Sequence, residues 1–95
     1  MSNSKFKIDD KVLFIGDVLD IDADMQQDLV DRSISGSTYD GCMAALRNKQ
    51  PLTVKVVCLE DRGVSYELST EKGKRFTMMF DEEDLIKYEP AHSPV

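Results

Sequence analysis

Three segments in the second half of the chain alternate apolar with polar residues, and short turns that end on glycine separate them. An extended chain places successive side chains on opposite faces, so this period predicts strands that are covered by a core on one face. Gly63 and Gly73 can take the positive φ that tight turns require. We therefore predict an antiparallel meander of three strands over 52–59, 64–69 and 75–80.

Two shorter apolar segments, 11–15 and 85–88, are predicted to be the first and last strands. Five short strands are too few for two extensive sheets, and closure into a barrel removes exposed strand edges. The chain has 95 residues, too few for a second core. We therefore predict one mainly β domain over 1–95: a small five-stranded antiparallel barrel with short helices, spanning about 6–88, and a frayed tail at 89–95. Alternation assigns ten residues to the core: Val12, Phe14, Val54, Val56, Tyr66, Leu68, Phe76, Met78, Phe80 and Leu85.

The segment 17–51 between the first strand and the meander is too long for a structureless connection in a compact domain. Ile21, Met25 and Leu29 recur at a spacing of four residues, which predicts an amphipathic helix with an aspartate at its N-cap. Residues 42–47 are predicted to form a second short helix, preceded by cap residues at 37–40 and ended before Pro51.

This insertion is strongly acidic, as is the chain as a whole. Eighteen Asp and Glu against 12 Lys and Arg give a net charge of −6, which opposes binding to phosphate backbones and favours basic partners. A connection between strands needs no such density of charge. We therefore predict that the insertion contacts a basic protein surface, the alternative being a solvated helix face that serves solubility. Six aspartates are the predicted partner-binding residues: Asp17, Asp20, Asp22, Asp24, Asp28 and Asp31.

Five of these aspartates also have the spacing of a twelve-residue calcium loop, at positions 1, 3, 5, 9 and 12 counted from Asp20. Met25 stands where such a loop has glycine, and Asp31 stands where it has glutamate. The Ile21/Met25/Leu29 spacing favours a helix instead. We expect no metal site, and an acidic metal-binding protein is the third alternative for the function.

Nothing in the sequence indicates catalysis. The only histidine, His92, lies in the predicted tail, and no nucleophile or phosphate-loop motif is present, so we expect no enzyme and no cofactor. Cys42 and Cys58 have no metal-ligand or C-x-x-C spacing and are expected to be reduced thiols. The N-terminus has no secretory signal and no segment is long enough to span a membrane, which predicts a cytoplasmic protein.

The arrangement of motifs is similar to that of a known class of domains. Residues 6–12 resemble the opening "F-x-x-G-D-x-V" of small Src-homology-3-like barrels of bacterial and bacteriophage proteins, with Asp9 in place of the glycine. Residues 39–43 and 52–54 resemble the aromatic–glycine–methionine and "T-V" motifs that follow a long variable loop in those domains. Residues 80–85 resemble the final aromatic strand with "E-x-L", with Phe80 where tryptophan is common. The resemblance implies a barrel and no particular activity, since this fold carries unrelated functions.

These observations favour a non-enzymatic binding module whose acidic insertion meets a basic protein surface. One form of this hypothesis is a phage- or prophage-type inhibitor that occupies the nucleic-acid-binding site of another protein. The alternative is a barrel that itself binds nucleic acid through the 72–75 hairpin. Charge placement discriminates the two, because the alternative needs a basic stripe with an aromatic residue. The residues of that stripe would be Lys49, Lys55, Lys72, Lys74 and Arg75, with Tyr66 or Tyr88.

Overall fold

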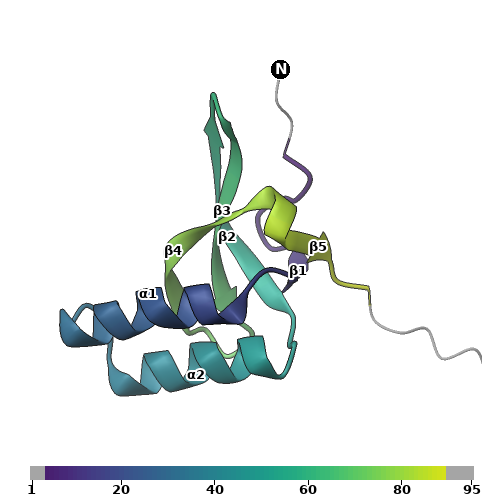
Figure 1. Cartoon of the computed structure of the whole chain (residues 1–95). Coiled ribbons are helices and arrows are strands. Elements are labelled where there is room, and N and C mark those ends of the chain that lie inside the picture. The colour runs from purple at the N-terminus through teal and green to yellow at the C-terminus, as the bar shows by residue number, and fades with distance from the viewer. Residues whose placement is uncertain (1–3, 90–95) are drawn as a thin grey trace, which may run out of the picture.

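The computed structural model describes residues 4–89 and consists of one antiparallel sheet with two helices packed against it (Figure 1). The strands lie in the order β4-β3-β2-β1-β5. The predicted strands and the helical insertion are confirmed, whereas of the predicted tail only Glu89 falls within the described residues. The elements in chain order are β1 (Lys11–Phe14), α1 (Val18–Val30), α2 (Gly36–Arg47), β2 (Leu52–Glu60), β3 (Gly63–Thr70), β4 (Arg75–Asp81), a 3-10 turn (Glu82–Asp84) and β5 (Leu85–Lys87).

The meander is formed by two tight connections. Gly63 begins β3 with a φ of 144°, and Gly73 lies in the β3–β4 turn with a φ of 89°. Both angles lie in the region that residues with a Cβ atom avoid, which explains why each turn ends on glycine. The hairpin β2–β3 extends to the pairs Leu59–Val64 and Glu60–Gly63.

A β-bulge in β2 places one residue of the predicted core wrongly. Val54 pairs with Leu68 and Val56 pairs with Glu67, so the register shifts by one residue at this point. Beyond the bulge Val57 pairs with Tyr66 and is half-buried, while Val56 is 39% exposed. The extra residue of a bulge inverts the face that each later side chain takes. Of the other predicted core residues, Phe14 and Met78 are partly buried and the remaining seven are buried.

Both helices begin at a capping side chain. The Asp17 carboxylate accepts a hydrogen bond from the Leu19 N–H at 2.9 Å, and the Ser35 hydroxyl accepts one from the Thr38 N–H at 3.1 Å. Because Ser35 is the N-cap, α2 begins at Gly36, six residues before its predicted start at Cys42. No helix between residues 4 and 89 is both long and apolar enough to cross a membrane.

The helices contribute a large part of the core, which the predicted core omits. Their buried residues join Phe76 and Phe80, whose rings meet edge to face with centroids 5.1 Å apart. The insertion is therefore an integral part of the domain, because it shares the hydrophobic core of the sheet. The buried helical residues are Met25, Cys42, Met43, Ala45 and Leu46.

The predicted closure into a barrel is wrong. The strands β4 and β5 are the two edges of the sheet and do not pair with each other. Two features keep the sheet open: β5 has only three residues, and α1 and α2 pack against β4, with α2 also contacting β3. The helices cover apolar surface of the meander that closure would otherwise have buried.

Candidate functional site

The spacing of the aspartates on α1 places five of them on one side of the helix. Asp17, Asp20, Asp24, Asp28 and Asp31 follow one another at intervals of three, four, four and three residues. Residues three and four apart lie on the same face of an α-helix. These five aspartates therefore form one stripe, here called the acidic stripe, along the full length of α1.

The stripe begins in a favourable electrostatic position. Asp17 caps α1, and Asp20 lies in its first turn, where the partial positive charge of the helix N-terminus stabilises carboxylates. Asp31 lies at the opposite end, where that effect is unfavourable, and its carboxylate accepts a hydrogen bond from Gln27 Nε2 at 3.1 Å. The sequence thus places negative charge even where helix formation does not benefit from it.

Asp28 is half-buried at the border between α1 and the sheet edge, and it accepts a hydrogen bond from the Thr77 hydroxyl of β4. Asp17, Asp20, Asp24 and Asp31 are exposed. The stripe therefore contacts the edge strand β4 at Asp28. Its three exposed carboxylates other than the N-cap are those of Asp20, Asp24 and Asp31.

Asp22, the sixth predicted partner-binding residue, lies apart from the stripe and faces α2. Its carboxylate accepts a hydrogen bond from the Tyr39 hydroxyl and lies 3.6 Å from the Arg47 guanidinium. The Tyr39 hydrogen bond and the Arg47 charge lower the pKa of Asp22, and the same hydrogen bond raises the pKa of Tyr39. Asp22 thus links α1 to α2.

The charge of the stripe is not neutralised by ion pairs within the part of the chain that the structure describes. The two ion pairs between residues 4 and 89 are Asp22–Arg47 and Glu67–Arg75, and neither includes a stripe residue. A row of unpaired exposed carboxylates produces a negative field, which attracts basic surfaces and weakens as salt is added.

The basic hairpin of the alternative hypothesis is arranged differently. Arg75 forms an ion pair with Glu67 across the sheet, and Lys74 is half-buried beside Gly41 of α2. A cavity of about 390 Å³ lies between α2 and the β3–β4 turn and is lined by Lys72 and Lys74. Tyr66, one of the two candidate stacking residues, is buried in the core, so its ring is not available to a base.

The calcium-loop spacing falls on helical backbone. Residues 20–30 lie within α1 and Asp31 is its C-cap, whereas a calcium loop must wrap its oxygens around the ion. Within residues 4–89, no group of three or more His, Cys, Asp or Glu side chains is arranged so that it could hold a metal ion.

The two cysteines are free thiols in different surroundings. Cys42 is buried in α2, and burial raises its pKa to about 11, so it stays protonated and unreactive at neutral pH. Cys58 lies partly exposed on β2 and donates to Glu60 Oε1 at 3.5 Å.

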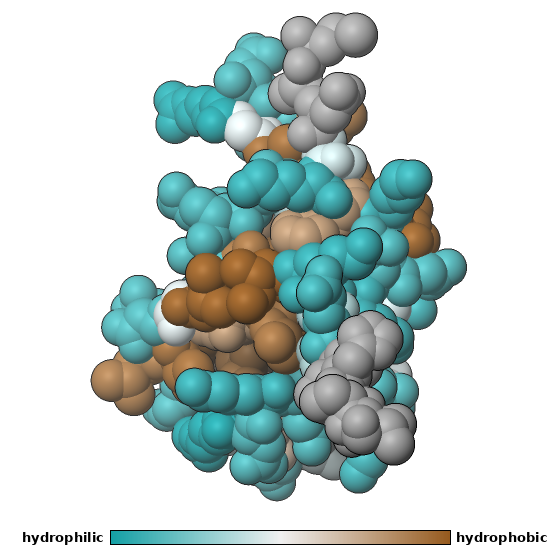
Figure 2. Space-filling view, turned by 90° about the vertical axis from the view of Figure 1, so that its right-hand side faces the viewer, coloured by the Kyte–Doolittle hydropathy of each residue, from teal (hydrophilic) through white to brown (hydrophobic). Residues whose placement is uncertain are grey.

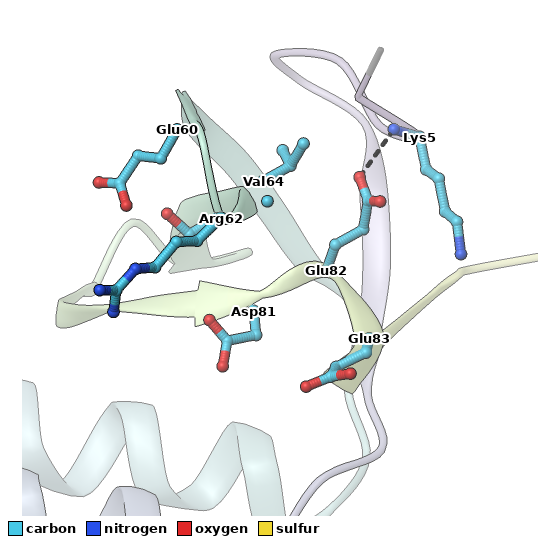
Figure 3. A pocket seen from close by; sticks show the side chains of 9 residues that line it. Lys5, Glu60, Arg62, Val64, Asp81, Glu82 and Glu83 are labelled. Carbon is cyan, nitrogen blue, oxygen red and sulfur yellow. Dashed lines mark hydrogen bonds between the residues drawn. The ribbon is translucent and has the colours of Figure 1, made fainter. Parts of the chain in front are cut away.

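An open pocket of about 400 Å³, which was not predicted from the sequence, lies between the β2–β3 turn and residues 81–83. Figure 3 shows Glu60 and Arg62 extending from the hairpin, with Glu82 pointing toward the backbone of Lys5. Glu82 accepts hydrogen bonds from the Lys5 N–H at 2.9 Å and from the Tyr66 hydroxyl at 2.5 Å. These bonds lower the pKa of Glu82, while burial and the bond to Glu82 raise the pKa of Tyr66 to about 12. The two hydrogen bonds of Glu82 link the N-terminal segment and the 3-10 turn to β3.

Comparison with protein families, with curated proteins and with solved structures finds no match to this chain.

Proposed function

We propose that this chain is a non-enzymatic binding module that contacts a basic protein surface through the acidic stripe on α1. The observation that carries the proposal is the alignment of Asp20, Asp24 and Asp31 as exposed carboxylates outside every described ion pair. Repulsion along such a row destabilises the folded state slightly, and a basic partner removes that repulsion. Electrostatic complementarity of this kind raises the association rate and selects the partner.

The same geometry is the basis on which we propose an inhibitor. A row of carboxylates about 16 Å long, from Asp20 to Asp31 at 1.5 Å per residue, has the sign of a nucleic acid backbone. A module that presents it can cover a basic nucleic-acid-binding surface on another protein. We propose this competition as the form that the activity takes.

The resemblance to Src-homology-3-like domains implies no particular activity and concerns only the local fold around residues 6–12. Asp9 occupies the position where the motif has glycine, and its φ of 75° lies in the region that glycine favours. Phe6 and Val12, the apolar residues of the same motif, are buried. The backbone at position 9 therefore has a conformation that a glycine would favour, in a sheet that is open.

The experiment compares two triple variants that remove the same charge. The stripe variant carries Asp20→Asn, Asp24→Asn and Asp31→Asn, while Asp22 and Asp28 are left unchanged because each accepts a hydrogen bond that links α1 to another element. The control variant neutralises three exposed carboxylates away from α1 through Asp40→Asn, Asp61→Asn and Glu71→Gln. Both variants should fold, which circular dichroism and thermal unfolding will verify.

A partner isolated by affinity pull-down should bind the stripe variant more weakly at low salt, and this difference should narrow as salt rises. The control variant should keep most of the affinity. Where that partner binds nucleic acid, the wild-type chain should displace a labelled oligonucleotide from it and the stripe variant should not. Equal affinities of wild type and stripe variant at low salt would contradict the proposal.

Direct binding of nucleic acid is the alternative, and the cavity beside Lys72 and Lys74 is the feature that favours it. A labelled oligonucleotide that binds the chain alone, and is released by Lys72→Gln with Lys74→Gln, would establish that alternative in place of the acidic stripe.

A further inference from the structure

A second surface feature lies next to the start of the acidic stripe. Figure 2 shows hydrophobic side chains gathered on the face of the molecule that carries β1 and β5. Ile15 is 55% exposed, Leu19 is 73% exposed and Ile86 is 46% exposed. Together with the half-buried Leu13, these residues are here called the β1–β5 patch.

Strand pairing explains why the patch is continuous. Leu13 pairs with Ile86, so both side chains lie on the same face of the sheet. The ladder continues through the Ile15 N–H, which donates to the Asp84 carbonyl at 2.8 Å, so Ile15 takes that face as well. Val12 and Phe14 take the opposite face toward the core. Thus β1 is apolar on both faces, and the residues that the structure describes cover the face of Leu13 and Ile15 only in part.

Carboxylates border the β1–β5 patch. Asp17 stands between Ile15 and Leu19, and Asp20 follows in the first turn of α1. The carboxyl carbon of Asp84 lies 3.1 Å from where a Cβ on Gly16 would be. Lys11 lies on the same face as Leu13, but its Nζ donates to Thr53 Oγ1 at 2.6 Å. The patch is therefore an apolar centre bordered by carboxylates on the side of α1 and by the Lys11 ammonium at the start of β1.

We propose that the β1–β5 patch and the first turn of α1 together dock a basic amphipathic segment of a partner protein. Apolar side chains of that segment pack on Leu13, Ile15 and Ile86, while its lysines or arginines meet Asp17 and Asp20. The proposal rests on the proposed function and deepens it, because it adds an anchor that salt does not screen. Interfaces gain most of their affinity from such desolvated centres, with charges at the rim.

The test uses two synthetic peptides of equal length and equal lysine content, with either leucine or serine between the lysines. At low salt the wild-type chain should bind the leucine peptide about tenfold more tightly than the serine peptide, which is the gain expected from burying one aliphatic side chain. Ile15→Ser and Ile86→Ser, made separately, should each reduce that preference. Val30→Ser is the matched control, because Val30 is 75% exposed at the far end of α1.

The possible results separate the two proposals. Failure of both peptides to bind would overturn the proposed function and this inference together. Equal binding of both peptides, or a preference that survives Ile15→Ser and Ile86→Ser, would overturn the inference alone. Sedimentation of the wild-type chain gives the remaining test. A dimer that Ile15→Ser abolishes would show that a second copy covers the patch, and this result would also overturn the inference.

Discussion

The meander and the helical insertion both bury apolar residues in one core, but their sequence patterns indicate the buried residues in different ways. In the meander the buried side is set by alternation along each strand, as for Tyr66 and Leu68. In the insertion, α1 has an apolar stripe, an acidic stripe and exposed apolar residues such as Val30 on one helix. The buried face of a strand can be predicted from the alternation along that strand. The full buried surface of a helix with several distinct faces can be predicted only when its neighbours are known.

The largest expected effect lies in the meander. Phe76→Ala should lower the free energy of unfolding by about 3–5 kcal/mol, because the ring is 2% exposed and packs edge to face on Phe80. Met79→Ala is the control on the same strand, where the side chain is 41% exposed and the loss should be small. Denaturant titration measures both changes, and similar losses for the two variants would show that the face assignment of β4 is wrong.

The second prediction asks whether the insertion is as integral to the fold as the meander. Met25 of α1 is fully buried, so Met25→Ala should cost about 2–5 kcal/mol of stability. Val30→Ala, at a side chain of the same helix that is 75% exposed, should change it little. Urea titration measures the unfolding midpoint of both variants. If Met25→Ala left the midpoint for unfolding of β2–β4 unchanged, the insertion would be a separable unit, contrary to the single core described above.

Most of the fold follows from local patterns in the sequence. Alternation predicts the meander, the two glycines predict its turns, and the spacing of Ile21, Met25 and Leu29 predicts α1. The bulge at Lys55 cannot be predicted from the sequence pattern. Val56 and Val57 are both apolar, so alternation does not indicate which of the two faces the core. The open sheet also does not follow, since it depends on how the helices pack against β4 and β3.

The candidate site was predictable only in part. The number and helical spacing of the aspartates identify the acidic stripe and set Asp22 apart from it, but no local pattern predicts the partners of Asp22, because they lie on α2. The sequence also carries a signal for the β1–β5 patch. Leu13 and Ile15 are apolar on the face opposite Val12 and Phe14, and a strand that is apolar on both faces needs two coverings.

The third prediction sharpens the comparison at the bulge. Val54→Thr places a hydroxyl in the core without changing side-chain volume much, so it should cost about 1–3 kcal/mol. Val56→Thr, two residues later, should have an effect within about 0.5 kcal/mol, since that side chain reaches solvent. Strict alternation without a bulge would make the two losses equal, and thermal unfolding of the pair of variants distinguishes these outcomes.

The fourth prediction concerns acid sensitivity, which the meander acquires from the Tyr66–Glu82 hydrogen bond. Tyr66→Phe should cost at least about 1.5 kcal/mol at neutral pH, because it removes the hydrogen bond to the Glu82 carboxylate and the hydroxyl that accepts from the buried Phe6 N–H at 3.3 Å. The pKa of Glu82 is lowered in the folded state, so its contribution is present above its ordinary value of 4.5 and is lost as the pH falls below it. The difference in stability between wild type and variant should therefore narrow in acid, while the part that comes from the Phe6 N–H remains. Urea titration at neutral and acidic pH measures it, with Tyr39→Phe as the comparison in the insertion.

The smallest expected effect lies in the turn before β1, where neither alternation nor helical spacing applies. Asp9 has a φ of 75° while its N–H donates to the Val54 carbonyl at 2.8 Å, so the backbone conformation is fixed by pairing with β2. Asp9→Gly relieves the cost of a left-handed residue, about 1 kcal/mol, but glycine also gains freedom in the unfolded chain, so the net gain should stay below about 1 kcal/mol. Asp9→Ala keeps the Cβ and loses the tolerance that aspartate has for this region, so it should be destabilising. The melting temperature should therefore be highest for the Asp9→Gly variant, intermediate for wild type and lowest for the Asp9→Ala variant. An alanine variant as stable as the glycine variant would show that this turn takes an ordinary φ.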